Sequence, residues 1–406
     1  MDPLITAAAR ALASGDALGA LNYIAWRDDP AALALRGIAM AQLGDLSRAR
    51  ALLRRAARAF NPREIVAGAR CAIAEAEIAL VSRDLSWPMN GLDAAHDALA
   101  RRGDHTNAAH ARYLKARYLL LIGRLDQTER LLADFDPAPL PPASRAGHEL
   151  VVAGVAMRRL QIAAACAALA RAEAAARQAG IPSVLAEVRT AALSLDTPAA
   201  RLIARGTEQL VRLADIEKLL SSKALIVDAC RHLVYHLGEV ISLETRPVLF
   251  TLARALAEAW PKEVPRAALL ARAFRAKYAD ESYRARLRVE IGRLRGALRA
   301  AAVIEATKAG FTLVPRRASG VVVLAPPTDD AHAIVLALLA DGEAWSSSAL
   351  ALALGASQRT VQRALDELAI EGKVRTTGRG RARRWLTPPV PGFPTTLLLP
   401  AALSNG

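Results

Sequence analysis

The sequence predicts a mainly α protein with small β-sheets in its second half. Hydrophobic residues make up 53% of the 406 residues but aromatic residues only 4%, and much of the apolar content is alanine. This composition favours closely packed helices, because alanine has the highest helix propensity whereas aromatic and β-branched residues favour strands. Apolar side chains recur at three- and four-residue spacing in the first half, and an alternating pattern begins only near Ala224.

The charge balance predicts a polyanionic partner. The formal net charge is +15 and the isoelectric point is about 10.5, which favours nucleic acid or an anionic membrane surface as the partner. The first residues, MDPLITAAARALASGD, lack the features of a signal peptide, and no apolar run approaches the roughly 18 residues of a membrane span. Three scattered cysteines are expected to be small buried side chains in a reducing compartment. We therefore expect a cytoplasmic protein that does not bind membranes.

Residues 1–205 are predicted to form a series of helices joined by short breaks. The stretch AMAQLGDLSRARALL (39–53) is similar to YLLLIGRLDQTERLL (118–132). Gly44 and Gly123 are 79 residues apart, about twice a 40-residue repeat unit. We expect each Gly to end one helix and the residues that follow it to start the next.

This pattern resembles degenerate tetratricopeptide (TPR)-like helical-hairpin repeats over about half of the chain. It lacks much of the repeat consensus, notably the aromatic positions. The resemblance implies a superhelix with a concave face, which would bind a peptide or protein ligand or associate with itself into a homodimer. A helical domain with only structural duties is the alternative.

Residues 206–325 are predicted to contain short strands, three helices and a hairpin. The stretch ALIVDACRHLVYHLGEVISLETRP (224–247) alternates apolar and polar residues, as strands do. Helical patterns follow at 246–259, 265–274 and 282–299. The stretch VIEATKAGFTLVPR (303–316) is typical of two strands joined by a turn.

The order of these pieces resembles the OmpR/PhoB-type winged-helix effector domain over residues 224–317. The matching stretches are LETRPVLFTLARALAEA, VPRAALLARAF, LRVEIGRLRGAL and AGFTLV. The resemblance implies that the third helix enters the DNA major groove and that the hairpin, the wing, contacts the neighbouring backbone. No receiver domain precedes these stretches, so control by a phosphorelay is not expected.

The cations of this region are candidate DNA contacts. Between Arg246 and Arg317 there are 16 Lys or Arg residues against 6 Asp or Glu, enough to neutralise phosphates. The candidates are Arg284, Arg286, Arg288, Arg293, Arg295 and Lys308. The expected core face of the third helix is Leu287, Ile291, Leu294 and Leu298. Glu290 and Gly292 stand where the family usually has polar or basic DNA-facing residues. A carboxylate on a groove-facing surface repels phosphate, although it can accept a hydrogen bond from cytosine N4. A dimerisation or docking role for this region therefore stays open.

Residues 326–406 are predicted to form a helix-turn-helix, a β-hairpin and a Pro-rich tail. A linker at 325–330 and an apolar helix within 331–345 precede a helix that starts at Ser347 or Ser348. Ser357 is expected to cap the next helix after a tight turn at Gly355. The expected apolar contacts of the two helices are Leu350, Leu352, Leu354, Val361, Leu365 and Leu368.

The outward residues of this last helix and the cations of the hairpin form a second candidate DNA interface. Arg can bridge guanine O6 and N7, and Gln can pair with adenine N6 and N7. The helix candidates are Ser357, Gln358, Arg359, Thr360, Gln362 and Arg363, and the hairpin candidates are Lys373, Arg375, Arg379, Arg381, Arg383 and Arg384. Trp385 is expected to anchor the returning strand in the core. Residues 330–387 resemble bacterial winged helix-turn-helix regulators. The resemblance implies that the last helix contacts base edges and that the wing binds the DNA backbone.

The sequence contains no motif that indicates an enzyme. It lacks a P-loop, a Rossmann glycine fingerprint, HExxH and GxSxG, and its seven His are dispersed. His232 and His236 are four residues apart without an obvious third ligand, so a structural pair is favoured over a metal site. We expect no cofactor, no metal and no catalytic residue.

Three domains and three candidate functions follow. The expected domains are 1–205, 206–325 and 326–406. The first function is a bacterial transcription regulator that binds double-stranded DNA through two winged helices. The second is an interaction scaffold whose OmpR-like domain docks a protein while only the last domain touches DNA. The third is a sequence-nonspecific nucleoid or RNA-binding protein.

Overall fold

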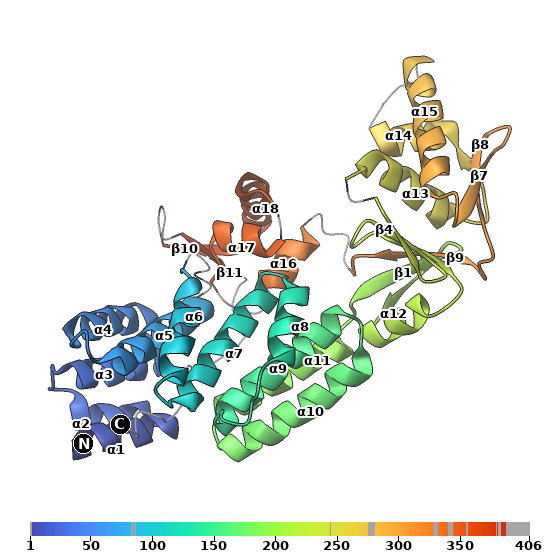
Figure 1. Cartoon of the computed structure of the whole chain (residues 1–406). Helices are drawn as coiled ribbons and strands as arrows, with labels where there is room; N and C mark the ends of the chain where they lie inside the picture. Colours follow the sequence, from blue (N-terminus) through green and yellow to red (C-terminus); the bar gives the residue numbers. More distant parts are fainter. Residues whose placement is uncertain are drawn as a thin grey trace. The chain divides into compact units, whose positions relative to one another are not determined.

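The computed structural model describes residues 2–82, 84, 87–243, 245–274, 281–327, 332–339, 344–354, 356–378, 380 and 383–386. The chain forms two compact units, one of Met1–Ser194 with Ile334–Gly406 and one of Leu195–Ala333. Helices predominate and the sheets are small, which confirms the fold class at this level (Figure 1). Within the described residues, none of the helices is both long enough and apolar enough to span a bilayer.

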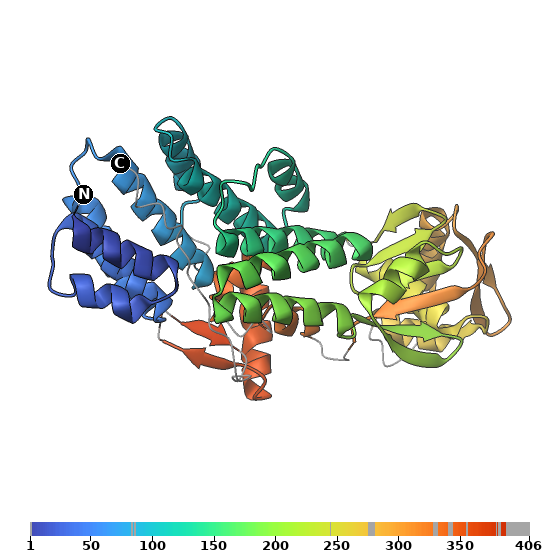
Figure 2. The same cartoon turned by 90° about the horizontal axis from the view of Figure 1, so that it is seen from below.

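The first unit begins with helices that pack in consecutive pairs, and the views in Figures 1 and 2 show neighbouring helices side by side. The bounds are α1 Pro3–Ala13, α2 Ala17–Ile24, α3 Pro30–Gln42, α4 Leu46–Ala59, α5 Ile65–Val81, α6 Asn90–Ala100, α7 His105–Leu121, α8 Leu125–Ala133, α9 Pro142–Arg158, α10 Ile162–Ala179 and α11 Pro182–Asp196. Small alanines such as Ala39 and Ala49, both 0% exposed, lie in the helix contacts.

The predicted breaks between helices are confirmed. Gly44 and Gly123 follow α3 and α7 with φ of +86° and +74°, a conformation that is costly for residues with a Cβ. Asp45 then caps α4, since its carboxylate accepts from the Arg48 amide at 3.0 Å. The expectation of helix up to residue 205 is wrong at its end, because α11 stops at Asp196 and a strand begins at Ala200.

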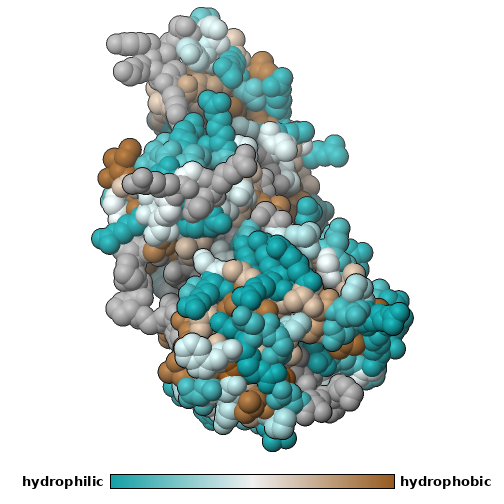
Figure 3. Space-filling model, turned by 90° about the vertical axis from the view of Figure 1, so that its left-hand side faces the viewer, coloured by the Kyte–Doolittle hydropathy of each residue, from teal (hydrophilic) through white to brown (hydrophobic). Residues whose placement is uncertain are grey.

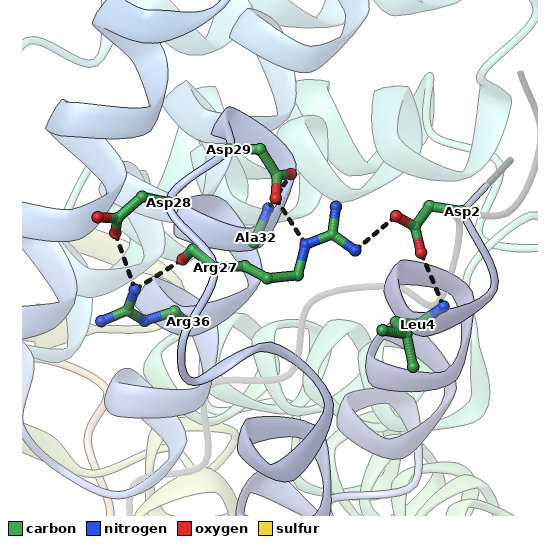
Figure 4. A network of polar contacts seen from close by, with 7 residues as sticks. All are labelled: Asp2, Leu4, Arg27, Asp28, Asp29, Ala32 and Arg36. Carbon is green, nitrogen blue, oxygen red and sulfur yellow. Dashed lines mark hydrogen bonds and ion pairs between the residues drawn. The ribbon is translucent and has the colours of Figure 1, made fainter.

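An ion-pair network connects the start of α1 with α3 and the segment before it (Figure 4). The Arg27 guanidinium contacts Asp2 and donates from Nε to Asp29 Oδ2 at 2.7 Å. Its hydrogen bond to Asp2 holds the pKa of that carboxyl below its usual value. Arg36 donates to the Arg27 carbonyl at 2.8 Å and to Asp28 at 3.2 Å. These groups are solvent-exposed in part, so they fix local geometry more than they stabilise the fold.

A buried hydrogen-bonded chain joins α5, α7 and α9. His110 Nε2 lies 3.1 Å from Glu77 Oε2, and Ser144 Oγ lies 3.3 Å from His110 Nδ1. Glu77, His110 and Ser144 are 3%, 1% and 5% exposed. These residue types also occur in hydrolytic triads, but side chains so deeply buried cannot meet a substrate. The chain satisfies polar groups inside the helical core.

The cysteines differ in exposure. Cys71 is buried, and desolvation raises the pKa of its thiol to about 12, so it stays protonated. Burial also raises the pKa of the half-buried Cys230 to about 11. Cys166 is exposed, so the expectation of three buried cysteines is wrong at this position.

In its described residues, the second unit combines two mainly antiparallel sheets with four helices. Its elements are β1 Ala200–Ala204, β2 Thr207–Val211, α12 Leu213–Leu220, β3 Leu225–Asp228, β4 Leu233–His236, β5 Glu239–Ser242, α13 Pro247–Ala259, β6 Val264–Pro265, α14 Arg266–Phe274, α15 Glu281–Ala297, β7 Ala302–Ala306, β8 Gly310–Pro315 and β9 Val321–Ala325. The larger sheet has the order β2-β1-β9-β3-β4-β5, with β9 parallel to β3, and the smaller has the order β6-β8-β7.

The core of the second unit lies between α13, α14, α15 and the two sheets. The predicted core face of α15 is confirmed, since Leu287, Ile291, Leu294 and Leu298 are all at most 2% exposed. They contact the same apolar cluster as Leu252 and Leu256 of α13. The expected strands, three helices and hairpin are all present, and β1, β2, α12, β6 and β9 are additional elements.

The C-terminal part of the first unit forms three helices and a β-hairpin in its described residues. Its elements are α16 Ala333–Leu339, α17 Ser347–Leu354, α18 Gln358–Ile370, β10 Arg375–Thr377 and β11 Arg384–Leu386. Trp345 and Trp385 exchange backbone hydrogen bonds at 2.8 and 2.7 Å and are 0% and 1% exposed, so Trp385 anchors the returning strand as predicted. Leu350 is buried, but Leu352 is 44% exposed, which corrects one of the expected apolar contacts. Gly355 and the tail from residue 387 lie outside the described residues.

One hydrophobic cluster includes residues of this C-terminal part and of the helices before it. Leu339, Trp345, Leu365 and Trp385 belong to the same cluster as apolar residues of α5, α6 and α7. The chain thus returns to its N-terminal helices after the second unit.

Candidate nucleic-acid interface

Helix α18 has one buried face and one exposed polar face. Val361, Ala364, Leu365 and Leu368 are at most 6% exposed, which confirms the predicted core face. The candidates Gln358, Arg359, Thr360 and Arg363 are exposed, and Gln362 is half-buried. The first two turns of α18 are therefore accessible to a large ligand.

The predicted cap of α18 is confirmed. Ser357 Oγ accepts from the Thr360 amide at 3.1 Å and lies 2.8 Å from Thr360 Oγ1. The two hydroxyls thus interact with each other at the helix N-terminus. Backbone N–H groups and the helix dipole make this end favourable for a phosphate.

The polar side chains of α18 differ in their partners. Gln358 Nε2 donates to Ser347 Oγ at 3.1 Å, and Gln362 Nε2 donates to Asp366 Oδ1 at 3.0 Å. Arg363 lies 3.9 Å from Glu367. Within the described residues, Arg359 has no ion pair or hydrogen bond from its side chain. Exposed pairs of this kind are weak, so the arginines remain available to an anion.

A cavity of about 580 Å³ lies between α17, α18 and the hairpin. It is lined by Ser346, Ser347, Ser348, Gln358, Gln362, Gly380, Arg383 and Trp385. Ser346 Oγ accepts from the Ala349 amide at 3.1 Å, so it caps α17. The serines were not among the predicted site residues, although three consecutive serines before an apolar helix are the sequence signal that marks them.

The hairpin carries cations close to this cavity. Lys373 pairs with Glu371 at 2.8 Å, and Arg383 lies 3.8 Å from Asp366 and 4.2 Å above the Trp385 ring. Arg384 donates to the Arg383 carbonyl at 3.2 Å. The exposed Arg375 forms no side-chain hydrogen bond or ion pair with another described residue. Arg379 and Arg381 lie outside the described residues.

The candidate cations of α15 are on the surface, but each already contacts another group of the second unit. Arg284 and Arg288 lie 3.6 and 3.3 Å from Glu281, and Arg293 donates to Glu290 at 2.8 Å. Arg286 lies 4.6 Å above the Phe274 ring, and Arg295 Nε donates to the Ile304 carbonyl at 2.8 Å. Lys308 lies in the turn between β7 and β8, where its carbonyl accepts from Arg266.

A shallower cavity of about 470 Å³ lies between the start of α13 and α15. Arg246, Val248, Glu290 and Arg293 are among its lining residues. Its lining thus combines one carboxylate with two guanidinium groups. Phosphate binding here would have to compete with Glu290.

The face of the molecule drawn in Figure 3 is mostly hydrophilic, and its apolar residues gather only in small separate areas. Among the described residues, no three His, Cys, Asp or Glu side chains come together as a metal-binding group.

No protein-family model matches the sequence, and no curated protein or solved structure matches it at a significant level. Any functional conclusion therefore depends on the geometry of these residues.

Proposed function

We propose that the chain is a DNA-binding transcription regulator, with α17, α18 and the β10–β11 hairpin as a winged helix-turn-helix that binds double-stranded DNA. The observation that carries this proposal is the exposed N-terminal half of α18, where Arg359 and Arg363 project beside two glutamines. A helix of this composition can read base edges in a major groove.

The surroundings of α18 suit a DNA backbone. The serine-lined cavity at the start of α17 offers hydroxyls and backbone N–H groups, and Arg383 adds a cation at its edge. Lys373 and Arg375 lie on the hairpin strand and the turn before it. Phosphate contacts of this kind position a protein on the duplex, while base contacts give specificity.

The second unit supports a second DNA contact through α15 and the β7–β8 hairpin. Its order of elements, from β3 to β8, follows the OmpR/PhoB-type winged helix that the sequence resembles. In this reading α15 is the groove helix and Lys308 lies at the wing turn. Two DNA-binding helices in one chain would suit an extended DNA site, or a dimer bound to paired half-sites.

A specific observation favours the docking alternative for this unit. Arg286, Arg293 and Arg295 already contact Phe274, Glu290 and Ile304 within the unit. Exposed Val289 and Gly292 lie on the outward side of α15, opposite its core face, where a protein partner could pack. In that case only α18 and its hairpin would bind DNA.

The helical pairs α1–α10 would form a TPR-like platform for sensing, dimerisation or partner binding. Trp26 is 98% exposed and Tyr23 is 45% exposed at the end of the first pair. Exposed aromatic residues are enriched where proteins meet partners. These residues are where contact with a peptide or a second copy would be sought.

Genome-wide mapping of bound DNA tests the proposal. The intact chain should give discrete peaks that share a sequence motif, and the Arg359→Ala/Arg363→Ala variant should lose the motif. Uniform coverage that the variant does not change would instead support a nonspecific nucleoid protein. Enrichment of RNA over DNA would support the RNA-binding alternative.

A further inference from the structure

A cationic cavity of about 540 Å³ lies in the second unit at the C-terminal end of α15. Its walls come from the β4–β5 turn, from the residues after α15 and from the segment between β8 and β9. The lining residues are His236, Leu237, Glu239, Arg299, Ala300, Arg316 and Arg317. Arg288 and Arg299 are eleven residues apart in sequence, which corresponds to roughly 16 Å along a helix. The cavity is thus distant along the chain from Arg284, Arg286 and Arg288, whereas Arg295 lies only four residues before Arg299 and turns its guanidinium to the Ile304 carbonyl.

The charge of the cavity is positive. Arg299, Arg316 and Arg317 are exposed and form no side-chain ion pair or hydrogen bond with another described residue. Glu239 is the one carboxylate that lines the cavity within the described residues. Three guanidinium groups and one carboxylate around one cavity leave it with an excess of positive charge. This charge attracts an anion into the cavity.

His236 adds a buried polar group to the wall of the cavity. It lies on the wall of the cavity, is only 4% exposed, and its Nδ1 has no hydrogen-bond partner among the described residues. A buried polar atom without a partner costs about 1–3 kcal/mol. Nδ1 is itself shielded from solvent, so the ring has to turn this atom towards the cavity before a ligand oxygen can become its partner.

We propose that this cavity binds the phosphate group of a small phosphate ester. Planar guanidinium groups favour phosphate, with which they can form two parallel hydrogen bonds. A volume of about 540 Å³ is far larger than one phosphate and lies within the usual range of small-molecule sites. Leu237 and Ala300 provide apolar wall for the rest of the molecule. The C-terminal end of α15 carries partial negative charge, so the arginine side chains rather than the helix hold the anion.

The position of the cavity links ligand binding to the fold of the unit. Its walls belong to both sheets, since His236 ends β4 of the larger sheet and Arg316 follows β8 of the smaller one. A bound ester therefore holds the two sheets together and raises the stability of the unit. This role does not depend on whether α15 or α18 binds DNA.

Calorimetric titration of the full chain with glycerol 3-phosphate and with inorganic phosphate, at constant ionic strength, tests the proposal. We expect saturable binding of the ester that is tighter than binding of inorganic phosphate. The Arg299→Ala/Arg316→Ala variant should weaken it by tenfold or more. The Lys218→Ala/Lys262→Ala variant removes two exposed cations elsewhere in the unit and should bind normally. Absence of saturable binding, or equal loss in both variants, would overturn the proposal.

Two replacements of His236 test the role of its buried nitrogen. Asn places an amide nitrogen near the position of Nδ1, whereas Leu removes the polar atom and keeps similar bulk. We expect His236→Asn to retain most of the affinity and His236→Leu to lose about tenfold. Equal affinity in the two variants would contradict the assignment.

DNA-binding measurements on the same variants distinguish a site for a phosphate ester from a contact with the DNA backbone. The Arg299→Ala/Arg316→Ala variant should bind duplex DNA as the intact chain does, while Arg359→Ala should weaken DNA binding and leave the ester titration unchanged. If replacing the two arginines lowers DNA affinity and the intact chain does not bind the ester, the cavity contacts the DNA backbone and the proposal fails. The proposed DNA-binding function and the ester site therefore fail independently.

Discussion

Arg293 donates a hydrogen bond from Nη1 to Glu290 Oε1 at 2.8 Å, within one turn of α15. The Glu290 side chain is 13% exposed whereas that of Arg293 is 65% exposed, so the carboxylate is held near the surface of the helix and the guanidinium is accessible. Both line the cavity that also contains Arg246. The carboxylate therefore lowers the positive potential where α15 would meet a phosphate.

Replacing Glu290 with Gln tests whether α15 contacts DNA. The change keeps the shape of the side chain and removes one negative charge beside Arg246 and Arg293. If this face approaches a duplex, we expect DNA affinity to rise about two- to fivefold at low salt. Fluorescence anisotropy with a labelled duplex measures the change.

Glu208→Gln is the matched control for this change. It removes the partner of Arg201, 3.1 Å away on the six-stranded sheet, and should leave DNA affinity unchanged. If Glu290→Gln also has no effect, the docking role of the second unit is favoured.

Arg359 is expected to give sequence preference to α18. The Arg359→Ala change should reduce discrimination between a selected duplex and a random one by about 1–3 kcal/mol, as for the loss of a bidentate base contact. Competition binding with a duplex enriched by selection measures this difference. Arg63→Ala removes an exposed arginine of the helical part and should not change it. An equal loss of affinity for both duplexes would show that Arg359 contacts only the DNA backbone.

The cations of the hairpin are expected to act on all duplexes alike. Replacing Arg375 and Arg383 together with Ala should reduce the slope of log affinity against log salt by about two units, since each lost phosphate contact contributes roughly 0.9. The preference among sequences should stay the same. A change of preference without a change of slope would place these arginines at base edges instead.

Local signals explain why α15 and α18 could be predicted from the sequence. Ser357 precedes an amphipathic run and caps it, and the core face of each helix follows its own 3.6-residue period. The mistake at Leu352 has a physical origin as well. Leu350 and Leu352 are two residues apart, and side chains at that spacing point in nearly opposite directions on a helix.

The strands that sequence reasoning missed depend on distant partners. In β9, Val323 pairs with Ile203 of β1 on one side and with Val227 of β3 on the other. Both partners are about a hundred residues away in the chain, so nothing local specifies the pairing. A short apolar run such as VVVLA fits a strand or a buried helix segment equally well.

The serine-lined cavity beside α18 and the cavity at His236 could not be predicted from the sequence for the same reason. Ser346 and Arg383 lie 37 residues apart in sequence, and His236 and Arg316 lie 80 apart, yet each pair lines one cavity. The sequence identified the arginines of the first site by composition. It could not identify the serines or the histidine, because their role depends on what lies opposite them.

Two glycines of the second unit should respond to alanine in opposite directions. At Gly310 an added Cβ would lie 1.8 Å from the Val264 carbonyl oxygen, so Gly310→Ala should destabilise the unit by about 3 kcal/mol. At Gly296, within α15, an added Cβ meets nothing within 4 Å, so Gly296→Ala should stabilise it by about 0.5–1 kcal/mol. Thermal unfolding of the two variants measures both shifts. Similar shifts of one sign would contradict the strand pairing at Gly310.

His148 is expected to make the first unit sensitive to mild acid. Its ring stacks on Phe135 with centroids 4.9 Å apart, and burial lowers the pKa of its imidazole, while Glu149 opposes the shift and Arg171 adds to it. The unfolded state therefore takes up the proton more readily than the folded state. Stability is fully present above the ordinary histidine pKa of about 6.5 and falls as the pH drops below it.

Urea unfolding at a series of pH values from about 8 to 5 measures this dependence. His148→Phe keeps the ring and removes the titration, so the midpoint should fall less steeply on acidification than in the intact chain. The control is His96→Phe, which replaces a histidine whose Nδ1 lies 3.0 Å from the exposed Asp97. It should leave the steep acid dependence in place. If His148→Phe keeps the full dependence, another group in the unit binds the proton, because a phenyl ring at this position cannot.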